Sequence, residues 1–336
     1  MSGAAAAAAD FSRFGAAVGH ATDAEGATGL TVVRGTDGPL RGAAAVVGRA
    51  TGTRELQALV PGGLAGRVDA VLLTGGSAYG LDAAAGVMRW MEERGRGFPI
   101  GPGVVPIVPA AVIFDLAPLG RYGARPTPAM AYEACDAARP VPAAEGSVGA
   151  GTGATVGKSA GIQWAMKGGV GCAVAESGDA AAGAVAVVNA FGDVRDERGA
   201  ILAGARAPGG GFADGARLLA EGAAPLAARP SDVVRTLNTT LAAVLVSAPL
   251  PRIALQQLAA AAAAALYRRI TPAGTSFDGD IIFALAPFGD PQREPPDSPP
   301  ARLQLEALAV RALEHAIERA VRLARGRDGV PGLGDE

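Results

Sequence analysis

Two short apolar runs, each following a group of polar residues, set the strongest limit on how this chain can fold. The runs cover residues 241–246 and 281–285, and turn-forming residues bound them. Runs of this length are too short for helices and are typical of buried strands. Hydroxyl side chains precede the first run and carboxylates precede the second. The sequence therefore predicts two core strands that begin beside polar groups.

The polar groups before the two runs allow a structural and a chemical interpretation. As structure, residues 238–240 are an ordinary start of a strand, and Asp278-Gly279 is typical of a hairpin turn, because glycine accepts a positive φ. As chemistry, a hydroxyl and a carboxylate at the start of a rigid strand can serve as a nucleophile and its acid–base partner. The residues alone leave both interpretations open.

Composition argues against several classes of protein. A net charge of −2 gives no electrostatic basis for binding nucleic acid or an anionic membrane. No apolar run reaches the roughly 18 residues that span a bilayer, and the first residues lack the basic start of a signal peptide. Cys135 and Cys172 form no C-x-x-C pattern and are too few for a disulfide framework, which favours a reducing cytoplasm.

Histidine is scarce, and this scarcity limits the possible mechanisms. A Ser-His-Asp device, a Cys-His pair or a histidine-bound metal would have to use His20 or His315. His20 lies in a segment rich in glycine and alanine, and His315 lies among charged residues on the expected surface of a helix. Neither position is typical of a catalytic histidine, so no metal or other cofactor is predicted.

A glycine-rich segment at residues 147–161 imitates two nucleotide-binding motifs. A P-loop needs glycine where Thr152 stands, so the match to that motif fails. Gly149, Gly151 and Ala154 fit a dinucleotide-binding fingerprint, but no predicted strand precedes them. The segment is therefore not interpreted as a nucleotide site.

The T-L-N-T-T-L stretch at residues 236–241 and the D-G-D stretch at residues 278–280 together resemble a known family. This is the family of self-cleaving N-terminal-nucleophile hydrolases that contains the L-aminopeptidase/D-esterases, the β-peptidyl aminopeptidases and the 6-aminohexanoate-oligomer (nylon oligomer) hydrolases. Its precursors break just before a Ser or Thr that opens a buried strand. The resemblance implies a cut between Asn238 and Thr239.

The same resemblance implies roles for residues of the reaction centre. Thr239 is the implied nucleophile, and its freed α-amino group is the implied base. Asn189, at the end of an apolar run, is the implied donor to the oxyanion. Asp278 and Asp280 are implied to orient the amine and relay protons, because two nearby carboxylates can share one proton.

Five more side chains are candidates for the expected site. The family's glycine-rich segment ends in a lysine that points into the active site, which is Lys158 here, but Lys167 in A-M-K-G-G-V-G competes and spacing does not settle the choice. Tyr79, in the similar string G-G-S-A-Y-G-L-D, is expected to contact substrate. Phe114 stands where several oligomer hydrolases have Tyr, which removes a hydroxyl. Asp115 is either the acid that holds a substrate ammonium or a structural carboxylate at a strand end.

The resemblance also implies a fold and an activity. The expected fold is an α/β four-layer α-β-β-α sandwich at residues 29–325, with tails at 1–28 and 326–336, and the cut gives chains of residues 1–238 and 239–336. The expected activity is hydrolysis of small peptides, amides or ω-amino-acid oligomers, led by aminopeptidase activity, in a homo-oligomer for which the family suggests a tetramer. An acyltransferase and an uncleaved binding protein are the alternatives.

The rest of the chain is expected to surround the two core strands. Helices are expected at residues 78–93, 252–269 and 301–325, further strands at 30–33, 43–47, 68–73, 110–116 and 183–188, and a mobile loop at 195–230.

Overall fold

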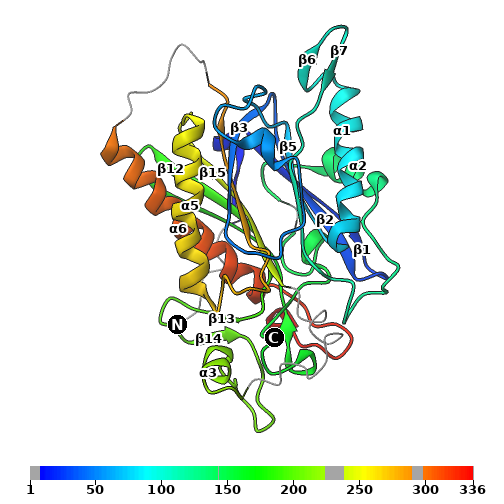
Figure 1. Ribbon diagram of the computed structural model, residues 1–336, viewed down its shortest axis with the longest axis vertical. Coiled ribbons are helices and arrows are strands. Elements are labelled where there is room, and N and C mark those ends of the chain that lie inside the picture. The colour runs from blue at the N-terminus through cyan, green and yellow to red at the C-terminus, as the bar shows by residue number, and fades with distance from the viewer. Residues whose placement is uncertain (1–7, 143, 224–237, 290–297, 336) are drawn as a thin grey trace.

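Two five-stranded sheets lie at the centre of the chain (Figure 1). The structure is a computed structural model that describes residues 8–142, 144–223, 238–289 and 298–335. The first sheet has the order β1 (Ala16–Asp23), β2 (Thr28–Gly35), β5 (Ala70–Thr74), β8 (Ala110–Val112) and β4 (Thr53–Arg54). The second has the order β11 (Gly169–Ser177), β12 (Ala180–Asn189), β15 (Thr239–Val246), β17 (Ile281–Pro287) and β3 (Leu40–Val46).

The two predicted core strands, β15 and β17, are neighbours in the middle of the second sheet. They run parallel, with Leu241 opposite Ile281. On its other side β15 pairs antiparallel with β12, which puts Asn189 directly opposite Thr239. Asp278, which precedes β17, forms a parallel β-bridge with Asn238. The D-G-D segment therefore extends the pairing of two parallel strands, and its interpretation as a hairpin turn is wrong.

Helices cover the outer face of each sheet (Figure 1). On the second sheet lie α5 (Arg252–Arg269) and α6 (Pro299–Arg322), and on the first lie α1 (Ala84–Glu92) and α2 (Pro128–Ala137). The long alanine run of α5 allows this helix to approach α6 and the sheet closely, because alanine adds little bulk. The predicted α/β class is confirmed, and the bounds of α5 agree with the predicted ones.

The space between the two sheets is filled by a separate apolar cluster that includes the N-terminal segment. Phe11 and Phe14 are buried there beside side chains of β12 and β17, and Gly183 leaves room for both rings. Residues 16–23 then form the edge strand β1. The predicted N-terminal tail at residues 1–28 is therefore wrong from about residue 9 onward, because aromatic anchors tie this segment into the core.

The C-terminal segment is likewise part of the packed structure. The amide N–H of Lys167 donates to the carbonyl of Pro331, and the Gly326 N–H donates to the carboxylate of Asp335. The predicted C-terminal tail at residues 326–336 is therefore wrong for residues 326–335, whose main chain is bonded to the domain.

The segment predicted as a mobile loop contains defined structure up to residue 223. It includes part of β13 (Asp193–Arg195), then β14 (Ile201–Ala203) and α3 (Gly215–Ala220). The buried carboxylate of Asp193 holds these pieces together, because it accepts hydrogen bonds from the N–H groups of Ala205 and Gly215. Residues 224–230 of the predicted loop lie outside the described residues.

Short elements complete the described chain. The remaining strands are β6 (Phe98–Ile100), β7 (Gly103–Val105), β9 (Thr155–Val156), β10 (Met166–Lys167) and β16 (Ile270–Thr271). The 3-10 helices are η1 (Ser12–Phe14), η2 (Leu56–Leu59), η3 (Ser77–Ala83), η4 (Gly149–Gly151), η5 (Ile162–Trp164) and η7 (Leu333–Asp335). The helix predicted at residues 78–93 is thus a 3-10 helix followed by α1. In the described part of the chain, no helix is long and apolar enough to cross a membrane.

Candidate active site

Thr239, the first residue of β15, lies directly against the carbonyl group that precedes it. Its side chain is buried, with the residue 4% exposed, and its Oγ1 donates a hydrogen bond of 2.6 Å to the carbonyl oxygen of Asn238. The same oxygen accepts the N–H of Gly279 at 2.8 Å. A donor at this distance is suited to stabilise negative charge that develops on a carbonyl oxygen. Sequence reasoning missed this donor, because a main-chain N–H leaves no signal in residue types.

Two buried carboxylates flank Gly279. Asp280 accepts the N–H of Thr240 at 2.6 Å, and Asp278 accepts the N–H of Thr275 at 2.8 Å. Burial and the neighbouring charge of Asp278 raise the pKa of Asp280 to about 7. Burial also raises the pKa of Asp278, although the Lys158 ammonium opposes this rise. Near neutral pH the Asp280 carboxyl can therefore gain or lose a proton, as a group that relays protons must.

Lys158 and Asn189 form a hydrogen-bonded unit on the other side of Thr239. The Lys158 Nζ donates to the Asn189 Oδ1 at 2.9 Å and to its main-chain carbonyl at 3.1 Å. The Oδ1 atom also accepts the N–H of Thr155, and the Asn189 Nδ2 donates to the carbonyl of Phe114 at 3.1 Å. This network assigns the orientation of the amide, because two donors face Oδ1 and an acceptor faces Nδ2.

Lys158 is poised to change charge near neutral pH. Burial lowers its pKa to about 7, although the Asp278 carboxylate nearby acts in the opposite direction. A lysine in this state can exert a variable positive charge on the strand that begins at Thr239. The structure thus brings together Lys158, Asn189, Thr239 and the two aspartates, which are distant in sequence.

Lys167 lies in a different environment. Its Nζ donates to the main-chain carbonyls of Gly151, Thr152 and Ala154 at 2.7–3.3 Å. Burial lowers its pKa to about 7, and the charge that opposes this shift comes from Asp115. These bonds tie the glycine-rich segment to β10, so geometry separates the two lysines where sequence spacing could not.

Asp115 is sequestered inside the protein. The residue is 1% exposed, one carboxylate oxygen accepts the Thr28 hydroxyl at 2.7 Å, and the other accepts the Gly76 N–H at 2.6 Å. Burial raises its pKa to about 6. The carboxylate holds the glycine turn after β5. These contacts fit the alternative of a structural carboxylate, and its role as the acid that holds a substrate ammonium stays a prediction.

The two other expected substrate contacts lie at the edge of this network. Phe114 is half-buried, and its carbonyl accepts the amide of Asn189. Tyr79 is 54% exposed, and the guanidinium of Arg125 stacks on its ring at 3.5 Å from the centroid. Contact of either side chain with substrate stays a prediction.

The described residues form no metal-binding group. Within the described ranges, no group of three His, Cys, Asp or Glu side chains could hold an ion. His20, whose pKa burial lowers to about 4, hydrogen-bonds Thr31 in the first sheet, and His315 is exposed on α6. The site therefore gathers a buried hydroxyl, two carboxylates whose pKa values are raised, a lysine and two kinds of N–H donor.

Comparison with known proteins agrees with this geometry. Residues 14–333 match peptidase family S58. An uncharacterized aminopeptidase of Mycobacterium tuberculosis (strain ATCC 25618 / H37Rv) is 44% identical over 294 residues, covering 85% of this chain and 81% of the relative. A 6-aminohexanoate-oligomer endohydrolase of Paenarthrobacter ureafaciens is 30% identical over 309 residues, covering 89% and 80%.

Solved structures of low sequence identity share the fold. A β-aminopeptidase of Burkholderia sp. superposes with a TM-score of 0.69 at 21% identity, covering 98% of this chain and 92% of the other. An L-aminopeptidase D-Ala-esterase/amidase of Ochrobactrum anthropi, described as a variant of the Ntn hydrolase fold, gives a TM-score of 0.68 at 18% identity, covering 97% and 90%.

Proposed function

Because this chain belongs to peptidase family S58 and is a hydrolase, we propose that it is an N-terminal-threonine amide hydrolase that activates itself by cutting between Asn238 and Thr239. One observation carries the proposal. The Thr239 hydroxyl and the Gly279 N–H converge on the carbonyl oxygen of Asn238, at 2.6 and 2.8 Å. The nucleophile and a charge-stabilising donor are thus both present at the bond to be broken.

The self-cleavage proceeds through an ester. The Thr239 Oγ bonds to the carbonyl carbon of Asn238, the bond from that carbon to the Thr239 nitrogen breaks, and the hydroxyl proton passes to the leaving nitrogen. Water then opens the ester to give a carboxylate on Asn238 and a free α-amino group on Thr239. The Gly279 N–H stabilises the oxyanion in both steps. Asp280, whose pKa is raised to about 7, is suited to relay the proton.

Substrate hydrolysis repeats this chemistry with the freed amine as base. The reference pKa of an α-amino group is near 8, so a useful fraction is unprotonated at neutral pH. A positive charge on Lys158 disfavours the protonated amine and keeps it basic. The second Nδ2 hydrogen of Asn189, opposite Thr239 in the sheet, adds a donor to the oxyanion. Lys158, which contacts Asn189, is assigned this role in preference to Lys167, which contacts main-chain carbonyls.

The expected substrates are small peptides, amides or ω-amino-acid oligomers. The relatives are named as an uncharacterized aminopeptidase and as an oligomer endohydrolase, and neither name points to the acyltransferase or to the uncleaved binding protein. We further propose an α-β-β-α layering, cut into chains of residues 1–238 and 239–336. A cytoplasmic location and a homo-oligomer, for which the family suggests a tetramer, stay predictions.

A denaturing mass spectrum of purified protein tests the proposal. We expect two chains, the smaller of 98 residues beginning at Thr239, and one intact, inactive chain in Thr239→Ala. A wild-type protein that is fully active while uncut would disprove the role of the free amine.

A further inference from the structure

Asn238, the residue before the proposed cut, is paired with the segment that carries the two carboxylates. Its N–H donates to the carbonyl of Phe277 at 3.3 Å, and its carbonyl accepts the N–H of Gly279 at 2.8 Å. These two bonds from one residue form the parallel β-bridge between Asn238 and Asp278. Main-chain groups therefore hold Asn238 on both sides of its α-carbon.

A tight turn at residues 275–278 fixes the direction of the Phe277 carbonyl. The N–H of Asp278 donates to the carbonyl of Thr275 at 3.2 Å, and the N–H of Phe277 donates to the Thr275 hydroxyl at 3.3 Å. The N–H of Thr275 donates to the Asp278 carboxylate at 2.8 Å. Because the N–H and the carbonyl of one trans peptide unit point in opposite directions, the bond that closes the turn points the Phe277 carbonyl outward, toward Asn238.

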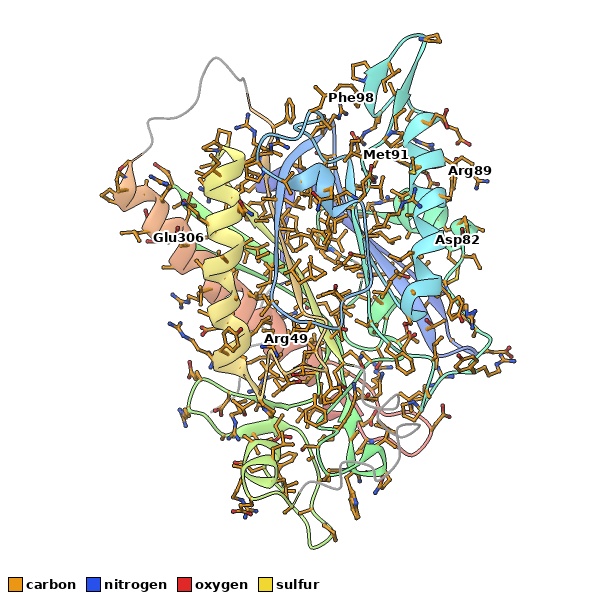
Figure 2. The ribbon with its side chains drawn as sticks, in the orientation of Figure 1. Arg49, Asp82, Arg89, Met91, Phe98 and Glu306 are labelled. Atoms are coloured by element: carbon orange, nitrogen blue, oxygen red, sulfur yellow. The ribbon has the colours of Figure 1, made fainter. Side chains whose placement is uncertain are left out.

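The turn borders solvent, although the nucleophile next to it is buried. Ser276 and Phe277 are exposed, whereas Thr239 is buried. The Ser276 hydroxyl accepts a hydrogen bond from Arg49, which lies near the lower end of α5 in Figure 2. The acceptor of the Asn238 N–H therefore belongs to a residue at the surface.

The position of Asn238 shows where the acyl group of a substrate has to bind. In the proposed self-cleavage, Asn238 supplies the carbonyl carbon that the Thr239 hydroxyl attacks. The same hydroxyl attacks the substrate, and the N–H of Gly279 again faces the carbonyl oxygen. With these two contacts fixed, the next carbon of the substrate takes the place of the Asn238 α-carbon. A nitrogen on that carbon then faces the carbonyl of Phe277.

We propose that the carbonyl oxygen of Phe277 binds the α-nitrogen of the substrate, so that the acyl unit pairs with residues 277–279 as one residue of a parallel strand. Both hydrogen bonds form only if the nitrogen is on the carbon next to the carbonyl group. The preferred substrates are therefore amides of α-amino acids. Amides of β- and ω-amino acids are slower, because their nitrogen lies farther along the chain. This inference rests on the proposed function, because it assumes that Thr239 is the nucleophile.

Three p-nitroanilides with different acyl units test this inference. They are L-alanyl, β-alanyl, whose nitrogen is one carbon farther away, and propionyl, which has no nitrogen. For the cut wild-type enzyme we expect kcat/KM for L-alanyl to exceed that for propionyl by about tenfold to hundredfold, as for a hydrogen bond from a charged group. The value for β-alanyl should lie below that for L-alanyl, because its nitrogen misses the carbonyl.

Variants of the turn show whether the Phe277 carbonyl causes this preference. Thr275→Val removes the hydroxyl that holds the Phe277 N–H, so the ratio of the L-alanyl to the propionyl value should fall toward one. The ratio is the readout, because an effect on the neighbouring Asp278 carboxylate changes both values alike. Thr275→Ser keeps a hydroxyl and should restore the ratio. Ser276→Ala is the matched control and should keep it, because this hydroxyl bonds outside the turn.

Several results would overturn the inference. A cut wild-type enzyme that turns over β-alanyl or propionyl as fast as L-alanyl, or none of the three, excludes it whether or not the variants fold. A wild-type ratio in cut Thr275→Val assigns the preference to another acceptor, and an equal fall in Ser276→Ala shows a general disturbance of the surface. Failure of the proposed function is separate, because the wild-type chain would then stay uncut in the mass spectrum.

Discussion

Replacing Gly279 by alanine tests whether the geometry around the Asn238 carbonyl drives self-cleavage. The φ of Gly279 is not in the left-handed region, so its backbone can accept alanine, and the Gly279 N–H is retained. The new methyl group would lie 2.8 Å from the Oγ1 of Thr239 and 2.5 Å from the carbonyl oxygen of Ala50. The perturbation therefore falls on the hydroxyl of Thr239 and on the loop at residues 47–50, and it replaces no titrating group.

The magnitude follows from these contacts. A contact of 3.4 Å is ordinary for a methyl group, so the Thr239 Oγ1 must move by about 0.6 Å and the carbonyl oxygen of Ala50 by about 0.9 Å. A misplacement of this order can cost about 10²-fold in rate, because the attack needs precise alignment. Overpacking costs about 1–3 kcal/mol of unfolding free energy. We therefore expect a folded protein in which self-cleavage is slowed by about 10²-fold.

Freshly translated protein, sampled over time and measured by denaturing mass spectrometry, gives the rate of self-cleavage, and thermal unfolding reports whether the variant folds. Gly123→Ala is the matched control, because a methyl group there meets no atom within 4 Å, and it should cut at the wild-type rate. If Gly279→Ala folds and cuts as fast as the wild type, the contact geometry does not limit the reaction and the reasoning fails.

Three other perturbations test different parts of the site. Asp278→Asn removes a negative charge that helps to raise the pKa of Asp280, so this pKa should fall from about 7. The acidic limb of the pH profile of kcat/KM should then move to lower pH. A limb that does not move would show that the two carboxylates do not act as a pair. Asp115→Asn should lower the unfolding temperature without changing the relative rates on free-amine and N-acetylated amides, because its carboxylate holds the turn after β5. Loss of a preference for the free amine would instead identify Asp115 as a substrate ligand. Chelators should leave activity intact, because the described residues form no group that could hold a metal ion. Thiol reagents should also have no effect, because burial raises the pKa of both Cys135 and Cys172. Inhibition by a chelator that added zinc reverses would disprove this prediction.

The local sequence pattern correctly predicted the strands and the helix that are specified by a few neighbouring residues. The strand that begins at Thr239 and the one that begins at Ile281 are apolar runs bounded by polar residues, and both lie in the second sheet. The helix at Arg252–Arg269 has an unbroken run of helix formers, ended by two arginines at its negative pole. In these cases propensity, burial and the charges at the helix end agree.

The local sequence pattern could not predict features that depend on tertiary contacts. Phe11 and Phe14 become core residues only because two sheets enclose them, so the N-terminal boundary was placed too late. Whether Lys158 or Lys167 faces Thr239 depends on which carbonyl groups the folded glycine-rich segment presents. The burial of Asp115 under the turn after β5 could not be predicted either. A carboxylate at the end of a strand has the same sequence pattern whether it is exposed to solvent or buried.

The position of β15 in the second sheet also determines the order of folding and of the proposed cut. Its two hydrogen-bonded neighbours come from opposite sides of the proposed cut, β12 from residues 1–238 and β17 from residues 239–336, and β3 of the first part closes the far edge of β17. Folding must therefore precede the cut, since Thr239 meets its partners only in the completed sheet. Once cut, the polypeptides have lost the tether that kept their effective concentration high. Refolding of the mature enzyme should then become second order in protein, while Thr239→Ala refolds at a rate independent of its concentration.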